Sequence, residues 1–432
     1  MTHHAYPRGA AHFLAPLAER FFNGALPVRL RAWDGSEAGP ADAPALVLRR
    51  PEALRRFLAR PGELGLARAY ITGDIDVAGD LGDGFRRVRA AVRERGTGRL
   101  TAADWAAAAR IAVSLRAVGR PPSPPASEAR LRGGVNTPGR DADAIAHHYD
   151  LSNALYALFM DPSMAYSCAY WTGDGPGYTL ADAQADKLAL ICRKLALTEG
   201  TRLLDVGCGW GSLALYAAEH HGARVTAVTL SEQQRDHVRK RIAERGLSHL
   251  VEVRRQDYRA IGDAPFDAVA SVEMGEHVGA RNFPVFASRL HALLRPRGRL
   301  LLQQMSRGRG ASPGGGPFIE SYIAPDMHMR PVGDTIALLE DAGLEVRDVH
   351  ALREHYVRTV AAWHAEFERR WDDAVRLVGE ETARVWRLYF VGGSLAFEEG
   401  RMGVDQILAV RPDPGGGSGM APVRGTGAGE WR

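Results

Sequence analysis

Three glycines at alternate positions follow an apolar run that contains an aspartate. The segment reads LLDVGCGWG over residues 203–211, and residues 212–221 are expected to form a helix. Glycine lets the backbone turn sharply and lets a ligand lie on the main chain, where a Cβ would collide. The helix that follows directs its amide groups and its positive end toward such a ligand. The pattern predicts a cofactor loop with contacts from Asp205, Gly207, Gly209 and Gly211.

The spacing of the glycines separates two classes of cofactor. A dinucleotide loop has the pattern G-x-G-x-x-G and an acidic residue about 20 positions later that holds the ribose. Here the pattern is G-x-G-x-G, and the next expected strand, 224–228, is followed by Thr229-Leu230-Ser231 without an acid. The loop is therefore similar to those that bind S-adenosylmethionine. Asp257, just past a further expected strand at 251–254, is a candidate for binding the adenine amino group.

Length and composition bound the class of protein. A chain of 432 residues with 45% apolar and 25% charged residues is expected to form two soluble globular domains. No run of about 18 apolar residues is present for a membrane-spanning helix, and the N-terminus lacks an apolar signal core, so we expect a cytoplasmic protein. Three scattered cysteines are too few for a disulfide framework or a metal cluster. The basic residues are nearly all arginine, which suits phosphate binding but equally a solvated surface.

The expected elements alternate between strand and helix in the second half of the chain. Strands are expected at 201–206, 224–228, 251–254, 266–272 and 299–303, with helices between them, and strands at 344–349 and 404–410 complete the sheet. This order predicts an α/β fold with a doubly wound, mostly parallel sheet and a ligand at its carboxyl edge. We divide the chain into a small N-terminal α+β domain (1–118), a linker (119–140), a catalytic domain (141–411) and a disordered tail (412–432).

Three further segments carry a resemblance to a known family. They read IAHHYDLSN at 145–153, MAYSCAYW at 164–171 and SVEMGEHVG at 271–279. With the glycine loop and VTLS at 228–231, they resemble the cyclopropane-fatty-acyl-phospholipid synthase family over about residues 140–410. The resemblance implies a class I S-adenosylmethionine methyltransferase fold. It also implies methylation of cis double bonds in lipid acyl chains. The cofactor contacts that it implies are Tyr166, Ser167, Thr229, Leu230 and Gln234.

The implied reaction sets requirements on the site. An alkene is a weak nucleophile, so the methyl donor must be a strong electrophile, and positive charge then appears on the acyl chain. Aromatic faces and a carboxylate at a distance stabilise such a charge, and a base must accept a proton. By resemblance the base is a bound bicarbonate, held by Cys168, Glu276 and Tyr356 with the backbone near Met305.

One position departs from the family pattern. Where many members carry a histidine on the fifth strand, this chain has Gln303. Glutamine donates and accepts hydrogen bonds but does not titrate near neutral pH. Loss of a proton from the added methyl closes a cyclopropane, whereas a hydride shift before proton loss leaves a methylene group, and Gln303 does not decide between the two.

Several alternatives remain open on the sequence alone. Cys168 by itself reads as a small buried residue, and Tyr356 as one aromatic in a helix. The substrate could be RNA or a small molecule, although no basic stripe with interleaved aromatics supports nucleic acid. A catalytically silent cofactor-binding subunit is a further alternative. The leading prediction is an enzyme that acts on unsaturated phospholipid at the inner membrane face, as a monomer or homodimer, with a reductase partner if the product is a methylene.

Overall fold

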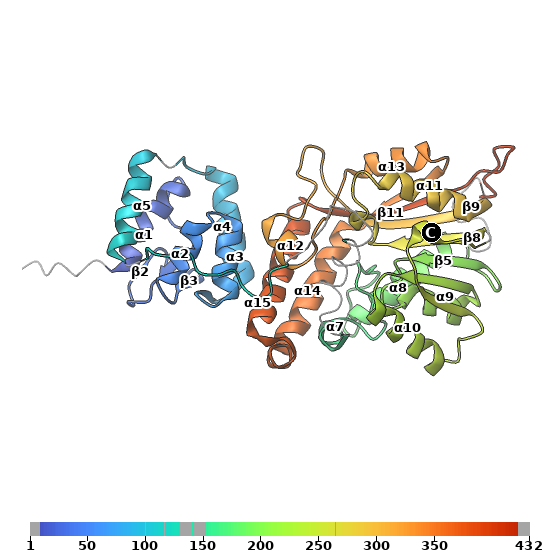
Figure 1. Ribbon diagram of the computed structural model, residues 1–432, viewed down its shortest axis with the longest axis horizontal. Coiled ribbons are helices and arrows are strands. Elements are labelled where there is room, and N and C mark those ends of the chain that lie inside the picture. The colour runs from blue at the N-terminus through green and yellow to red at the C-terminus, as the bar shows by residue number, and fades with distance from the viewer. Residues whose placement is uncertain are drawn as a thin grey trace, which may run out of the picture. The chain divides into compact units, whose positions relative to one another are not determined.

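The computed structural model describes residues 9–99, 101–115, 117–129, 140, 153–263 and 265–421. The chain divides into two compact units, which we call the N-terminal unit and the C-terminal unit. The N-terminal unit comprises residues up to 128 together with 379–391, and the C-terminal unit comprises the rest. Figure 1 shows the elements of both units.

The N-terminal unit is an α+β assembly. Its described strands form a four-stranded sheet in the order β2-β1-β3-β4. The strands are β1 (Arg29–Arg31), β2 (Glu37–Ala38), β3 (Ala45–Leu48) and β4 (Ile75–Ala78). The helices are α1 (Ala10–Phe21), α2 (Glu52–Ala59), α3 (Glu63–Ile71), α4 (Leu81–Arg95) and α5 (Ala102–Ser114). The middle of the long helix α15 (Trp371–Glu398) also belongs to this unit.

The C-terminal unit contains a mostly parallel sheet, as the sequence predicts. Its seven described strands are ordered β10-β11-β9-β8-β5-β6-β7, and β11 runs in the opposite direction to the other six. The strands are β5 (Arg202–Val206), β6 (Arg224–Thr229), β7 (Val251–Arg255), β8 (Phe266–Val272), β9 (Leu294–Ser306), β10 (Glu345–Ala351) and β11 (Gly403–Val410).

Helices cover both faces of this sheet, which explains why the central strands β5 and β8 are buried along most of their length. Figure 1 shows α8, α9 and α10 on one face and α11 and α13 on the other. The helices of the unit, besides parts of α15, are α7 (Asn153–Phe159), α8 (Leu180–Lys194), α9 (Ser212–His221), α10 (Glu232–Glu244), α11 (Phe283–Leu293), α12 (Pro317–Tyr322), α13 (Val332–Asp341) and α14 (Arg353–Arg369).

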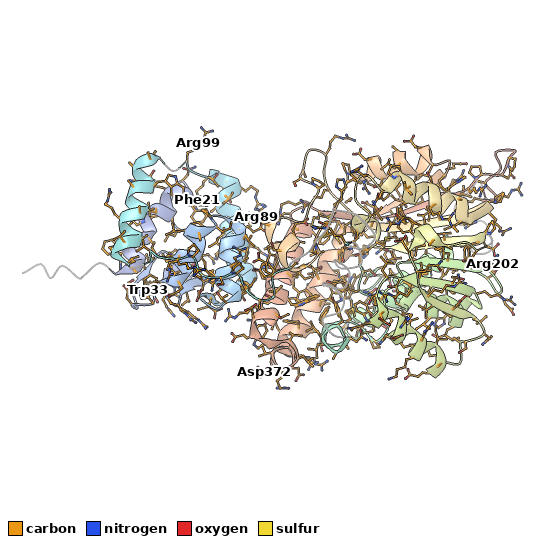
Figure 2. The ribbon with its side chains drawn as sticks, viewed as in Figure 1. Phe21, Trp33, Arg89, Arg99, Arg202 and Asp372 are labelled. Carbon is orange, nitrogen blue, oxygen red and sulfur yellow. The ribbon has the colours of Figure 1, made fainter. Side chains whose placement is uncertain are left out.

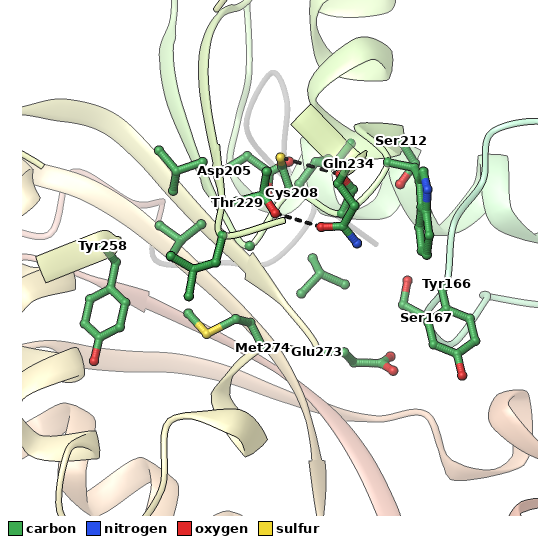
Figure 3. Close-up of a pocket in the computed structure, with 18 of the residues that line it drawn as sticks. Tyr166, Ser167, Asp205, Cys208, Ser212, Thr229, Gln234, Tyr258, Glu273 and Met274 are labelled. Carbon is green, nitrogen blue, oxygen red and sulfur yellow. Dashed lines mark hydrogen bonds between the residues drawn. The ribbon is translucent and has the colours of Figure 1, made fainter. Parts of the chain in front are cut away.

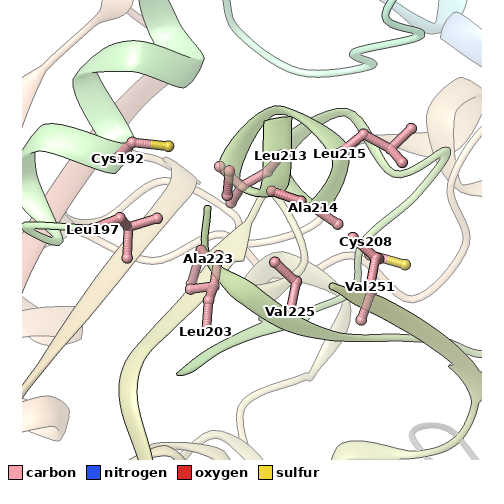
Figure 4. Close-up of a cluster of buried hydrophobic side chains, with 14 of the residues drawn as sticks. Cys192, Leu197, Leu203, Cys208, Leu213, Ala214, Leu215, Ala223, Val225 and Val251 are labelled. Atoms are coloured by element: carbon pink, nitrogen blue, oxygen red, sulfur yellow. The ribbon is translucent and has the colours of Figure 1, made fainter. Parts of the chain in front are cut away.

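Buried side chains pack the helices against the two faces of the sheet. On one face of the sheet, Leu203, Val225 and Val251 pack against α9 through Leu213 and Ala214 (Figure 4). On the other face, β5 and β8 pack against α11. Because the parallel strands end at one edge, the residues that follow β5, β6, β7 and β8 are brought together there.

Three further observations concern the described residues. All three cysteines are free thiols in buried positions. Among the residues that the structure describes, no helix has the length and apolar character needed to cross a membrane. Residues 412–421 form a turn whose amides at Gly415 and Gly417 donate to Asp413, and the rest of the predicted tail lies outside the described residues.

Candidate active site

A pocket lies at the carboxyl ends of β5, β6, β7 and β8 (Figure 3). It is lined by every residue predicted to contact the cofactor except Gly211. These nine are Tyr166, Ser167, Asp205, Gly207, Gly209, Thr229, Leu230, Gln234 and Asp257. Tyr166 and Asp257, 91 positions apart in the chain, therefore share one cavity with the segments between them.

The three glycines of the loop all require left-handed backbone, with φ of 80°, 53° and 83° at Gly207, Gly209 and Gly211. Around Gly209 the position of a Cβ is open, so the pocket reaches the main chain itself. At Gly211 a Cβ would meet Val238 on α10 at 2.9 Å. Gly211 is thus required for packing between the loop and α10 and does not line the pocket.

Asp205 at the end of β5 is prepared for a ligand. Its carboxylate is buried, and Oδ2 has no hydrogen-bond partner among the described residues. Burial raises the pKa of Asp205 to about 7, and the charge of Lys187 opposes this only in part. An unpaired buried carboxylate oxygen is costly unless a donor reaches it, as the hydroxyl or ammonium groups of a cofactor would.

The far end of the pocket presents polar groups from β6 and β7. The Thr229 hydroxyl donates to Gln234 Oε1 at 2.7 Å, which leaves the Gln234 amide nitrogen to face other partners. Ser231 caps α10 by accepting from the Gln234 N–H. Burial raises the pKa of Asp257, but hydrogen bonds from Arg259 outweigh this and lower it, so Asp257 is a carboxylate held by a guanidinium.

The segment carrying Tyr166 and Ser167 is fixed by α8. Gln184 Nε2 donates to the carbonyls of Ala165 and Ser167 at 3.1 and 2.9 Å. Lys187 Nζ donates to Ser167 Oγ at 2.7 Å and lines the pocket. Lys187 was not among the predicted site residues. Its only sequence signal is a lysine on the buried face of an amphipathic helix.

Glu273 lies where the predicted catalytic residues converge. The Cys168 N–H and Gln303 Nε2 each donate to Glu273 Oε1 at 2.8 Å, and the Tyr356 hydroxyl donates to Oε2 at 2.6 Å. The carboxylate is buried and also lines the cofactor pocket, pointing toward Ser167 and Tyr166 (Figure 3). We call Glu273 with these three donors the carboxylate cradle. The sequence analysis missed Glu273 and placed the carboxylate at Glu276.

The backbone at Glu273 is unusual. Its φ is 51°, a left-handed conformation that costs a residue with a Cβ about 1–2 kcal/mol. Such strain concentrates at functional sites, where the surroundings hold it in place. Burial raises the pKa of Glu273, and the hydrogen bonds from Tyr356, Cys168 and Gln303 lower it, as does the charge of Lys187. The net result is a buried carboxylate whose pKa lies above its usual value.

The donors of the cradle have their own supports. Gln406 Nε2 donates to Gln303 Oε1 at 2.9 Å, which turns the Gln303 amide nitrogen toward Glu273. The thiol of Cys168 points to the carbonyls of Ala169 and Leu352. Burial and the charge of Glu273 raise the pKa of Cys168 well above its usual value, so the thiol stays protonated. Cys168 thus serves the cradle through its main chain.

Glu276 occupies a different environment three residues later. It is buried in the short 3-10 turn Gly275–His277, and neither carboxylate oxygen has a hydrogen-bond partner within the described residues. Burial, with the charge of Glu273, raises the pKa of Glu276 to about 8, which the nearby amides of Glu276 and Met305 only moderate. Glu276 is therefore mainly a neutral acid at pH 7.

An aromatic wall connects the glycine loop to the cradle. Tyr166 stacks on Trp363, with ring centroids 5.1 Å apart, and Tyr156 lies 4.5 Å from Trp210. Tyr356 lies edge-on to Trp363 at 6.0 Å. Trp210 Nε1 donates to Asn153, the last residue of the 145–153 motif, whereas His148 and Tyr149 of that motif lie outside the described residues.

Fold and site together define a class of protein. A seven-stranded sheet with one reversed strand, a left-handed glycine loop and an unpaired carboxylate at the end of the first sheet strand are those of a class I S-adenosylmethionine methyltransferase.

Comparisons with known proteins agree. The mycolic acid cyclopropane synthetase family matches residues 137–407. A probable fatty acid methyltransferase of Mycobacterium tuberculosis is 38% identical, over 93% of this chain and 95% of its own. The tuberculostearic acid methyltransferase UfaA1 of the same organism is 33% identical, over 90% and 89%. The crystal structure of the mycolic acid cyclopropane synthase CmaA1, complexed with SAH and CTAB, is 30% identical with a TM-score of 0.58, over 62% of this chain and 97% of that one.

The chain therefore belongs to the mycolic acid cyclopropane synthetase family. It is a methyltransferase whose cofactor is S-adenosylmethionine. The residues present fit that cofactor, because the buried Oδ2 of Asp205 lacks a donor and the main chain at Gly209 is open to a ligand.

Proposed function

We propose that this enzyme transfers a methyl group to the cis double bond of an unsaturated phospholipid acyl chain, and that the Glu273 carboxylate accepts the proton that is then released. The observation that carries the proposal is the carboxylate cradle at the edge of the cofactor pocket. When an oxygen or nitrogen is methylated, its proton can be passed directly to water. Methylation of an alkene leaves a carbocation, whose proton must be removed inside a dry site.

The walls of the pocket suit a developing positive charge. S-adenosylmethionine supplies the methyl group as an electrophile. The alkene carbon forms the new bond to the methyl carbon while the methyl–sulfur bond breaks, which leaves the positive charge on the acyl chain. The aromatic side chains of Tyr166, Trp210 and Tyr258 line the pocket, and cation–π attraction is strongest where water is absent.

The base is then part of the chain. Bicarbonate was expected to be held by Cys168, Glu276 and Tyr356 with the backbone near Met305. In the structure the Cys168 N–H and the Tyr356 hydroxyl donate to the Glu273 carboxylate instead, as does Gln303 Nε2. The donors therefore do not fit an additional anion at this position, and we propose no step through bicarbonate. Positioned bases contribute about 10²–10⁴ to a rate.

Two products are open to the cation, and they differ in whether a hydride shift precedes the loss of the proton. Loss from the added methyl group closes a cyclopropane ring. A hydride shift followed by loss from the same carbon gives a methylene group, the precursor of a methyl branch. A methylene needs two electrons and two protons to become a methyl branch, so that product requires a reductase partner.

The location of the enzyme follows from the substrate. Acyl chains of phospholipids are reached at a membrane surface, so the proposal includes reversible binding to the inner face of the cytoplasmic membrane.

The direct test uses purified protein, vesicles of unsaturated phospholipid and S-adenosylmethionine labelled in its methyl group. Label is expected in the acyl chains, and proton NMR of those chains then separates ring protons from vinylidene protons. Label in added RNA or in a small soluble acceptor, or no label in any acceptor, contradicts the proposal. The last result would fit a silent cofactor-binding subunit.

A further inference from the structure

Helix α5 of the N-terminal unit carries an apolar stripe on its solvent side. Its exposed residues Ala102, Trp105, Ala106, Ala109 and Val113 recur every three or four positions, so they lie along one face. Trp105 is 49% exposed and Val113 is 62% exposed. A surface helix of a soluble unit normally turns charged and polar residues outward, so an apolar outer face indicates a docking surface.

The neighbouring helix extends the apolar character. Helix α1 packs against α5, and Arg20 of α1 forms an ion pair with Asp104 on the inner side of α5. Phe13 and Phe21 are exposed on α1. Figure 2 shows Phe21 on this unit. We call the apolar stripe of α5 together with these two phenylalanines the α5 face.

Positive charge accompanies this surface. Arg99, just before α5, and Arg110, between Ala109 and Val113, have no acidic partner within the part of the chain that the structure describes. Figure 2 shows Arg99 extending away from the unit. Helix α5 itself contains one arginine and one acid, and that acid, Asp104, is paired with Arg20. Guanidinium groups bind phosphate through paired hydrogen bonds, and basic residues beside a membrane are attracted to anionic lipid.

From these observations we propose that the α5 face binds the surface of an anionic phospholipid membrane. Trp105 and Val113 would enter the boundary between headgroups and acyl chains, where tryptophan is favoured. Arg99 and Arg110 would lie at the level of the phosphates. The choice of a membrane over a protein partner rests on Arg99 and Arg110, for which the described residues provide no acidic partner, and on the proposed function, in which the substrate is itself a phospholipid.

The test measures binding of the full-length protein to vesicles of phosphatidylglycerol and of phosphatidylcholine by sedimentation. Trp105→Glu and Val113→Glu should each weaken binding to phosphatidylglycerol by about tenfold or more, since each places a charge in the apolar boundary. The matched control is Leu66→Glu, at a 45% exposed leucine on α3 of the same unit, which should bind as the wild type does. The double variant Arg99→Ala/Arg110→Ala should lose the preference for phosphatidylglycerol and its dependence on salt.

A second measurement does not depend on introducing a charge. Vesicles with brominated acyl chains should quench part of the tryptophan fluorescence of the wild type. Trp105→Phe should keep the binding and lose that part of the quenching. Quenching that is identical in the two proteins overturns the proposal, as does equal vesicle binding by Val113→Glu and Leu66→Glu.

Methyl transfer separates this proposal from the proposed function. Val113→Glu should be slow on vesicles but equal to the wild type on the same lipid dispersed in detergent. If neither the wild type nor any variant methylates lipid, the proposed function is wrong, and the vesicle-binding data still decide whether the α5 face binds a membrane. If Val113→Glu changes the mass of the protein in solution and not its vesicle binding, the face joins two copies of the chain and the membrane proposal is wrong.

Discussion

Two buried carboxylates at the same edge of the sheet differ in their hydrogen-bond partners. Asp205 ends β5 with an oxygen that has no donor, and burial raises its pKa to about 7. Glu273 follows β8 with three donors on its two oxygens. The first group is incomplete without a ligand, whereas the second is complete without one. From this comparison we propose that Asp205 binds the cofactor and that Glu273 acts as the base.

The largest expected effect comes from substituting Glu273. Glu273→Gln keeps the shape of the side chain but cannot accept a proton as a carboxylate does. We expect methyl transfer to fall about 10²–10⁴-fold. Affinity for S-adenosylmethionine, measured by calorimetry, should stay within about threefold because the pocket keeps its shape. An undiminished rate would remove Glu273 from its assigned role.

Glu276→Gln is the matched control, with the same chemical change three residues away. Because burial raises the pKa of Glu276 to about 8, an amide resembles the neutral acid that is present at pH 7. The folded protein holds this proton more tightly than the unfolded chain does. The free energy of unfolding should therefore fall between about pH 4.5 and 8 through this group. Glu276→Gln should lessen that fall, and its methyl transfer should exceed that of Glu273→Gln by a wide margin.

The next largest effect is expected from substituting Asp205. Asp205→Asn should weaken cofactor binding by about 10–100-fold, the usual loss for a hydrogen bond to a charged group. In the wild type, affinity should fall as the pH drops below about 7, where Asp205 gains its proton. Without cofactor, the variant should melt at a higher temperature than the wild type at pH 8, because the buried charge is gone. Calorimetry and thermal melts check both, and cofactor affinity independent of pH in the wild type would refute the assignment.

A smaller effect is expected from a donor of the cradle. In the wild type, the hydrogen bond from Tyr356 to Glu273 Oε2 lowers the pKa of that carboxyl, and Tyr356→Phe removes this bond. The pKa of Glu273 should therefore rise, and the acid limb of the pH–rate profile should move to higher pH. At neutral pH the rate should fall about tenfold. A lower rate with an unmoved profile would mean that Tyr356 acts only through packing.

The smallest effect is predicted for the cysteine. Cys168→Ala keeps the main-chain N–H that donates to Glu273 and removes a protonated thiol. Methyl transfer should stay within about threefold of the wild type, since truncating one small buried side chain leaves the donor in place. A loss comparable to that of Glu273→Gln would show that the thiol itself takes part.

The two regions also differ in how far sequence could predict them. The residues of the cofactor pocket could be predicted because the glycine loop and Thr229 lie at the ends of strands whose apolar runs are plain in the sequence. The cradle joins Glu273 to Cys168, 105 residues earlier, and to Tyr356, 83 residues later. Neither the register of β9 against β8 nor the left-handed backbone of Glu273 has a signal in the residue pattern.

The most direct measurement of the central claim is the dependence of methyl transfer on bicarbonate. In buffer freed of carbon dioxide, the wild type should methylate at the same rate with and without added bicarbonate, because Glu273 fills the cradle. Glu273→Gly suits the left-handed backbone and empties the cradle, so its low rate should rise with added bicarbonate or formate. A wild-type rate that depends on bicarbonate would contradict the account.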